Sequence, residues 1–143
     1  MGALYLGVDV GTSSVKLTCI DEGGKVVATA SEAYECSEPH PGWREINPET
    51  WWIAICSACS LLGEKVDLSL IKGVGATGQM HTTVLIDADG VPTCPAIMWN
   101  DQRTIDAVFT EKQWALSAGY PKVASFLSTG VPAINLAWIA KNN

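Results

Sequence analysis

The first residues that could do chemistry lie at the end of an apolar, β-prone run near the start of the chain. The run ends at Asp9, and the residues after it that could form a ligand-binding turn are Gly11, Thr12, Ser13 and Ser14. Glycine lets backbone approach a ligand closely, and the hydroxyls add donors to the amides of the turn. A carboxylate is a favoured ligand of Mg²⁺. The pattern predicts a phosphate-binding turn with Asp9 facing the metal, and a plain β-hairpin with a polar turn is the alternative.

Two further clusters join an aromatic or apolar side chain to several hydrogen-bonding groups. One is Gln79-Met80-His81, and the other is Trp99-Asn100-Asp101 with Gln102 and Arg103 behind it. A sugar requires this mixture, because each hydroxyl needs donors and acceptors while its C–H face packs on an aromatic ring. The alternative is structural: a core histidine in the first cluster, and a helix cap beside a core tryptophan in the second.

The elements that must position these clusters follow from hydrophobic periodicity. The spacing predicts a mixed α/β fold, with a three-stranded antiparallel meander followed by strand and helix units. Asn47 caps a helix that begins at Pro48 and ends near Gly63, and its apolar residues form one broad face. That face comprises Trp51, Trp52, Ile55, Ala58, Cys59 and Leu62. The expected strands are residues 4–9, 15–20, 25–34, 71–79 (buried) and 82–86, and the other expected helices are 100–113 and 132–141.

Composition limits the classes of partner. The 143 residues are 48% hydrophobic, which suits one globular domain, and the net charge of −6 argues against nucleic acid or an anionic membrane surface. No targeting or membrane-spanning segment is visible. The five cysteines are irregularly spaced, which favours reduced thiols and a cytoplasmic location.

Two other motifs fail on their context. The stretch Gly73-Val-Gly75-Ala-Thr-Gly78 matches a dinucleotide fingerprint, but it lies inside an expected strand and no helix follows. Cys36, His40, Cys56 and Cys59 could form a zinc set, although the one Cys-x-x-Cys pair lies on the tryptophan-rich helix and core thiols are the preferred interpretation. Neither motif is expected to carry the function.

Four segments, in order, resemble the N-terminal part of the FGGY carbohydrate kinases: residues 7–16, 41–52, 78–81 and 95–104. The Asp-x-Gly-Thr turn is shared across the actin-like superfamily and specifies only the fold. Gln-Met-His with Trp-Asn-Asp-Gln-Arg is more specific, and within the family it is most similar to the xylulokinase branch. Thr82-Thr83 departs from the family pattern, and residues 113–129 have no match.

The resemblance implies a ribonuclease-H-like, actin-type ATPase domain and transfer of the γ-phosphoryl group of ATP to D-xylulose with Mg²⁺. It implies that Asp9 holds the metal, that Gly11, Thr12, Ser13, Ser14 and Lys16 bind the phosphates, and that Gln79, Met80, His81, Trp99, Asn100 and Asp101 bind the sugar. A homodimer is also expected.

Members of this family run to several hundred residues. We therefore expect residues 1–143 to form the N-terminal part of the first kinase domain. The catalytic aspartate base and the adenine pocket are expected to lie outside this chain, and the chain alone is expected to be inactive. The alternatives are a kinase for another pentulose, a polyol or gluconate; a non-metabolic actin-like ATPase; and a stand-alone binding module.

Overall fold

A computed structural model describes residues 2–142 of the chain. Its contacts divide the chain into two compact units, each built from two stretches of sequence. Unit 1 comprises Met1–Glu35 and Glu49–Gln79, and unit 2 comprises Cys36–Pro48 and Met80–Asn143.

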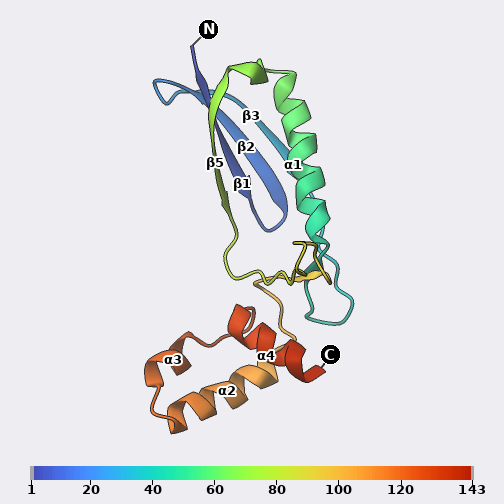
Figure 1. Cartoon of the computed structure of the whole chain (residues 1–143), viewed down its shortest axis with the longest axis vertical. Coiled ribbons are helices and arrows are strands. Elements are labelled where there is room, and N and C mark those ends of the chain that lie inside the picture. The colour runs from blue at the N-terminus through green and yellow to red at the C-terminus, as the bar shows by residue number, and fades with distance from the viewer. Residues whose placement is uncertain (1, 143) are drawn as a thin grey trace. The chain divides into compact units, whose positions relative to one another are not determined.

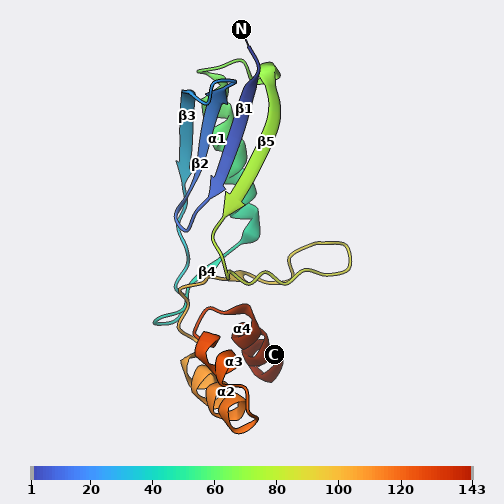
Figure 2. The same cartoon turned by 90° about the vertical axis from the view of Figure 1, so that its left-hand side faces the viewer.

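Unit 1 is built on a four-stranded mixed sheet (Figures 1 and 2). Its strands are β1 (Leu4–Val10), β2 (Ser14–Asp21), β3 (Val26–Ala33) and β5 (Ile71–Gly78), in the order β3-β2-β1-β5. β1, β2 and β3 pair antiparallel, and β5 adds parallel to β1. The expected antiparallel meander and mixed sheet are confirmed.

One face of the sheet is covered by helix α1 (Pro48–Gly63), which runs along the strands in both views (Figures 1 and 2). Side chains alternate across each strand, so every second residue faces the helix. Leu6, Val8 and Leu17 are among the buried residues of that face. The residues between them, Asp9 included, therefore point to the opposite face of the sheet. A short 3₁₀ helix (Leu68–Leu70) connects α1 to β5.

The boundaries of α1 agree with its predicted start at Pro48 and end near Gly63, but its buried face is narrower than predicted. Only Ala54, Ala58 and Leu62 are buried along the helix, whereas Trp52 is 61% exposed. Ala54 and Ala58, four residues apart, are small enough to let the helix lie close to the sheet, and the large indole of Trp52 is turned to solvent.

The expectation that residues 71–79 form a buried strand is wrong in one respect. β5 forms there, but most of its residues are exposed, including Val74 at 65%. Among the strands that the structure describes, β5 pairs with β1 alone and forms an edge of the sheet. An apolar run indicates that a strand can be buried. The strand is buried only if other elements pack against it, and β5 has one neighbouring strand among those described.

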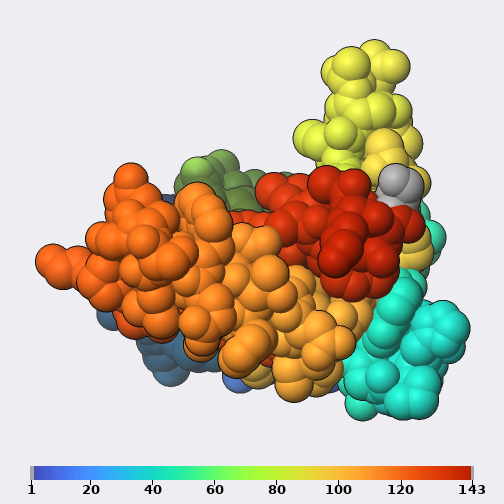
Figure 3. Space-filling model, turned by 90° about the horizontal axis from the view of Figure 1, so that it is seen from below, coloured from blue at the N-terminus to red at the C-terminus, as the bar shows by residue number. Residues whose placement is uncertain are grey.

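Unit 2 contains a two-stranded sheet and three helices. The strands are β4 (Glu45–Ile46) and β6 (Ala96–Ile97), and the helices are α2 (Ile105–Ser117), α3 (Pro121–Phe126) and α4 (Pro132–Asn142). Figure 3 shows the three helices, orange to red, forming one surface, while the hairpin around Asp87–Gly90 projects as a separate lobe in yellow. The expected helix over residues 132–141 is confirmed.

Two predictions in unit 2 are wrong. Residues 82–86 form no strand: they make isolated bridges, Thr83 to Ile97 and Ile86 to Pro92. The helix expected from residue 100 begins at Ile105 and ends at Ser117, because the carboxylate of Asp101 is bound by other groups rather than by a helix N-terminus. A turn forms at residues 87–90, where the N–H of Val91 donates to the carboxylate of Asp87 and Gly90 has φ 82°.

No helix among residues 2–142 is both long enough and apolar enough to cross a membrane. Over the same residues, no three or more His, Cys, Asp or Glu side chains gather as a metal site, and the zinc set of Cys36, His40, Cys56 and Cys59 does not assemble. The five cysteines are free thiols, of which Cys19 is buried.

Candidate active site

The carboxylate of Asp9 lies near the end of β1, on the face of the sheet away from α1. Lys16 on β2 and Thr77 on β5 are its two neighbours in register. All three line a hollow of about 490 Å³, together with Gly7 and Gly75, whose missing side chains leave it open. Within the described chain the Asp9 carboxylate accepts no hydrogen bond and forms no ion pair, so its oxygens are accessible to a cation.

The turn that follows Asp9 is closed by its own backbone. The N–H of Gly11 donates to the carbonyl oxygen of Ser14 at 2.9 Å. A Cβ at Gly11 would lie 3.1 Å from that oxygen, closer than ordinary contact, so glycine suits this tight approach. Ser13 is exposed at the tip, while Thr12 and Ser14 are half-buried.

Tyr34 holds this turn from the end of β3, and sequence reasoning missed it. Its hydroxyl donates to the carbonyl oxygen of Gly11, and its N–H donates to the carbonyl oxygen of Ser13 at 3.0 Å. Tyr34 as a whole is only 8% exposed. A buried tyrosine hydroxyl needs a hydrogen-bond partner. The tyrosine at the end of the expected strand 25–34 was therefore the sequence feature that could have indicated this contact.

Gln79 is the last residue of unit 1, directly after β5. Its N–H donates to the carbonyl oxygen of Val10 at 3.0 Å, which brings the ends of β5 and β1 together. Both side-chain amide atoms are buried with no hydrogen-bond partner among the described residues. An unsatisfied buried amide is costly, and a bound hydroxyl group would satisfy it.

In unit 2 an antiparallel bridge brings the other two predicted clusters together. Thr83 and Ile97 exchange two backbone hydrogen bonds of 2.8 and 3.0 Å. His81 and Trp99 each lie two residues beyond this bridge, at the same end of it. The structure therefore places Met80, His81, Trp99 and Asn100 in one region of the unit.

The exposure and backbone of these residues suit a binding surface. Met80 is 75% exposed and Trp99 is 47% exposed, both unusual for large apolar side chains. His81 has φ 68° and is the single described non-glycine residue with positive φ. Such a conformation costs free energy and is concentrated at functional sites. The Oδ1 atom of Asn100 is buried without a partner among the described residues.

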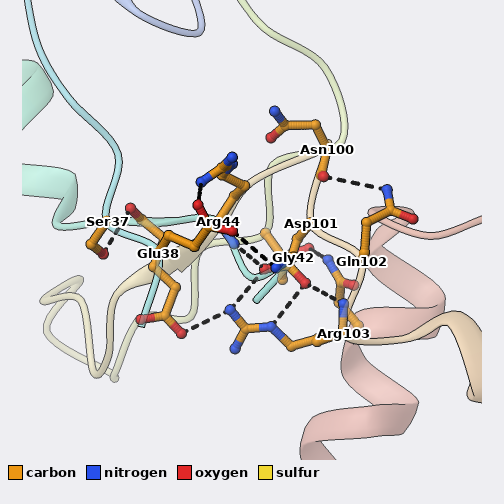
Figure 4. Close-up of polar contacts among 11 residues, drawn as sticks. Ser37, Glu38, Gly42, Arg44, Asn100, Asp101, Gln102 and Arg103 are labelled. Carbon is orange, nitrogen blue, oxygen red and sulfur yellow. Dashed lines mark hydrogen bonds and ion pairs between the residues drawn. The ribbon is translucent and has the colours of Figure 1, made fainter. Parts of the chain in front are cut away.

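Asp101 is placed differently from its neighbours. It is fully buried, and its carboxylate accepts hydrogen bonds from the N–H of Arg44 at 2.6 Å and from the N–H, Nε and an Nη of Arg103 at 2.8 to 3.0 Å (Figure 4). Its oxygens are thus occupied by protein donors.

Arg103 was not predicted as a site residue, yet it is at the centre of this network. Burial lowers the pKa of its guanidinium, but hydrogen bonds and charge from Asp101 and Glu45 outweigh burial, so the pKa lies above its usual value. The guanidinium carbon also lies 3.8 Å from the ring centre of Trp43 and 5.5 Å from that of Trp138.

The candidate site residues thus fall in both units. Unit 1 carries Asp9, Gly11, Thr12, Ser13, Ser14, Lys16 and Gln79. Unit 2 carries Met80, His81, Trp99, Asn100 and Asp101. Gln79 and Met80 are consecutive in the chain, so the two sets are covalently joined at this point.

Comparison with known proteins identifies the family. Residues 4–143 match the N-terminal domain of the FGGY family of carbohydrate kinases. A xylulose kinase of Klebsiella pneumoniae is 37% identical over 141 residues, which cover 97% of this chain and 29% of that protein. The chain thus spans less than a third of that relative's length.

Solved structures with the same fold include proteins with different acceptors. A kinase of Brucella ovis described as a xyloylose kinase aligns with a TM-score of 0.82 and 35% identity, over 97% of this chain and 29% of that one. A glycerol kinase of Plasmodium falciparum aligns with a TM-score of 0.79 and 26% identity, over 100% of this chain and 30% of that one. These likenesses confirm the actin-like ATPase fold. The chain belongs to the FGGY family of carbohydrate kinases.

Proposed function

We propose that this chain is the N-terminal part of an ATP-dependent sugar kinase that phosphorylates D-xylulose to D-xylulose 5-phosphate. The observation that carries the proposal is the bridge between Thr83 and Ile97, which brings His81, in a strained conformation, into one region with the half-exposed Trp99. The similarity to xylulose kinases supports this choice of sugar.

Unit 1 would supply the nucleotide half of the site. The accessible Asp9 carboxylate fits Mg²⁺, which prefers oxygen ligands and keeps several of its waters. Gly11, Thr12, Ser13, Ser14 and Lys16 would hold the phosphates of ATP, with Tyr34 fixing the turn. Support comes from the Plasmodium falciparum glycerol kinase, whose structure is described with ADP.

Unit 2, with Gln79, would supply the sugar half. Met80 and the indole of Trp99 would pack on the C–H groups of the sugar. His81, the Gln79 amide and Asn100 would bond its hydroxyls, since the last two carry buried atoms that have no partner among residues 2–142. Asp101 belongs to this half by position, but its carboxylate is already occupied by Arg44 and Arg103.

Phosphoryl transfer depends chiefly on positioning and charge neutralisation. In this proposal the residues of unit 2 would hold the sugar and those of unit 1 would hold the phosphates of the nucleotide. The aspartate that accepts the hydroxyl proton is proposed to lie outside these 143 residues, which cover 29% of the Klebsiella pneumoniae xylulose kinase. Bound Mg²⁺ would neutralise charge on the transferring phosphoryl group.

The test is an acceptor panel with the full-length enzyme: D-xylulose, D-ribulose, glycerol and gluconate, each with MgATP. D-Xylulose should give the highest kcat/KM. The His81→Ala variant should lose on the order of 10- to 100-fold in kcat/KM for the sugar, and the KM for ATP should stay within twofold. A higher kcat/KM for glycerol or gluconate would replace D-xylulose as the substrate. An unchanged kcat/KM in folded His81→Ala would make His81 structural.

The 143-residue chain by itself should show no kinase activity. General-base loss typically costs roughly 10²- to 10⁴-fold, and loss of other nucleotide contacts adds to this. Coupled-enzyme assay of ADP release at equal molar concentrations would compare it with the full-length enzyme.

A further inference from the structure

We propose that Asp101 and Arg103 form a buried clamp that positions Trp99 and Asn100 for the sugar, rather than contacting the sugar themselves. The clamp is defined here as the side chains of Asp101, Arg103, Glu45 and Trp43. This inference rests on the sugar-kinase function proposed above and assigns positioning roles to residues on the buried side of the same site.

The carboxylate of Asp101 has no capacity left for a ligand. The residue is 0% exposed, and its Oδ1 and Oδ2 atoms together accept four hydrogen bonds from Arg44 and Arg103. A sugar hydroxyl would have to displace one of these donors. Removing one partner of a buried charge pair leaves the other uncompensated, so such displacement is unfavourable.

Arg103 is enclosed on several sides. Its side chain is 4% exposed, and one of its Nη atoms lies 2.8 Å from both Asp101 and Glu45 (Figure 4). The guanidinium also stacks over Trp43 at 3.8 Å. A planar guanidinium can make these contacts at once, whereas the single ammonium of lysine cannot.

The segment that carries Trp99 and Asn100 is anchored on both flanks. Before it, the N–H of Met98 donates to the carbonyl oxygen of Arg44 at 3.0 Å. After it, Asp101 is held by the clamp. Gly130 lies against the segment: a Cβ there would be 1.7 Å from the carbonyl oxygen of Trp99. Trp99 and Asn100 therefore have little freedom of backbone position, and their side chains are directed by groups that a ligand does not touch.

The test compares the same substitution, arginine to lysine, at positions 103 and 44 of the full-length enzyme. Arg103→Lys keeps the charge but removes the bidentate contacts and the stacking. It should raise the KM for the sugar about tenfold while kcat and the KM for ATP stay within twofold, because misplacement of substrate-contacting groups weakens sugar binding. Arg44→Lys is the control, since the Arg44 side chain pairs with Glu38 at an exposed position. It should leave all three constants unchanged.

A double-mutant cycle tests whether Arg103 acts through its neighbours. In an Asn100→Ala background, Arg103→Lys should raise the sugar KM less than threefold, since part of what it positions is gone. A full tenfold effect there would contradict the positioning role. An unchanged sugar KM in folded Arg103→Lys, with only a lower Tm, would show a purely structural role.

If Arg103→Lys does not fold, Glu45→Gln is the milder variant, because it weakens one partner of the same guanidinium. It should raise the sugar KM about threefold, and an unchanged sugar KM would overturn the proposal. The result for the clamp does not depend on which sugar is the substrate. Should the acceptor panel show glycerol or gluconate as the substrate, the D-xylulose proposal fails, and the same ratios of KM measured on that acceptor still decide the role of the clamp.

Discussion

The hydroxyl of Tyr34, one residue beyond β3, donates a hydrogen bond to the carbonyl oxygen of Gly11 in the turn after β1. The N–H of the same residue bonds the carbonyl oxygen of Ser13. One buried residue therefore fixes two positions of the proposed phosphate turn, by its side chain and by its backbone. The geometry of this turn thus depends on a residue more than twenty positions away in sequence.

Tyr34→Phe should loosen the turn while keeping the ring buried. Loss of one buried hydrogen bond should lower the free energy of unfolding by about 1 kcal/mol. In the full-length enzyme the KM for ATP should rise several-fold, and the KM for the sugar should not change. Tyr5→Phe is the matched control, because Tyr5 is 41% exposed on β1. Equal effects of both substitutions on the KM for ATP would rule out a special role for Tyr34.

Asp9→Asn should damage turnover far more than folding. The carboxylate is exposed and its neighbour in register is Lys16, so its loss should change the stability of the metal-free protein by less than about 1 kcal/mol. Turnover should fall at least about 100-fold, because the charge that balances Mg²⁺ is removed. Thermal unfolding of the metal-free protein and the Mg²⁺ dependence of the rate are the measurements. A large fall in Tm with normal turnover would identify Asp9 as a structural turn residue.

His81→Gly separates function from stability. Glycine adopts φ near 68° without steric cost, so this variant should be as stable as the parent, or more stable by up to about 1 kcal/mol. Sugar phosphorylation should nevertheless fall as it does in His81→Ala. Urea unfolding and kcat/KM for the sugar test both statements. A marked loss of stability would indicate that the imidazole is held for packing.

Gly130→Ala should disturb the Trp99 segment. Its Cβ would meet the carbonyl oxygen of Trp99 at 1.7 Å, so the backbone must move, and the sugar KM should rise along with a loss of stability. Gly90→Ala is the control, because Gly90 has a similar φ of +82° but nothing lies within 4 Å of the added atom. The control should cost only the conformational penalty, roughly 1 kcal/mol, and leave the sugar KM unchanged. Equal stability losses in the two variants would contradict the steric argument.

Local patterns were sufficient for much of the fold. Hydrophobic periodicity predicted the meander, and the Asn47-Pro48 start and Gly63 end predicted α1. The failures came from long-range contacts. Asp101 was read as a helix cap, whereas its carboxylate binds Arg44, which is 57 residues away in the sequence. No local pattern encodes such a partner.

The residue types of the proposed site came from the sequence, whereas the contacts that each side chain makes in the fold did not. Motif resemblance selected Met80, His81, Trp99 and Asn100, and the structure brings them into one region of unit 2. The pattern could not distinguish Asn100 from its neighbour Asp101. The Asn100 side chain has a buried oxygen with no hydrogen-bond partner among the described residues, whereas the Asp101 carboxylate already accepts hydrogen bonds from Arg44 and Arg103. Tyr34 and Arg103 were missed because their importance arises from tertiary contacts with Gly11 and Asp101.

The single-sided pairing of β5 affects how this chain behaves in concentrated solution. Alternate backbone groups along its outer edge have no neighbouring strand among the described residues. Edges are commonly protected by charge or bulk, but β5 carries three glycines and Lys72 is its one charged residue. A further strand can therefore dock along it without a steric barrier. Self-association of the 143-residue chain through this edge would therefore depend on the eight residues of β5.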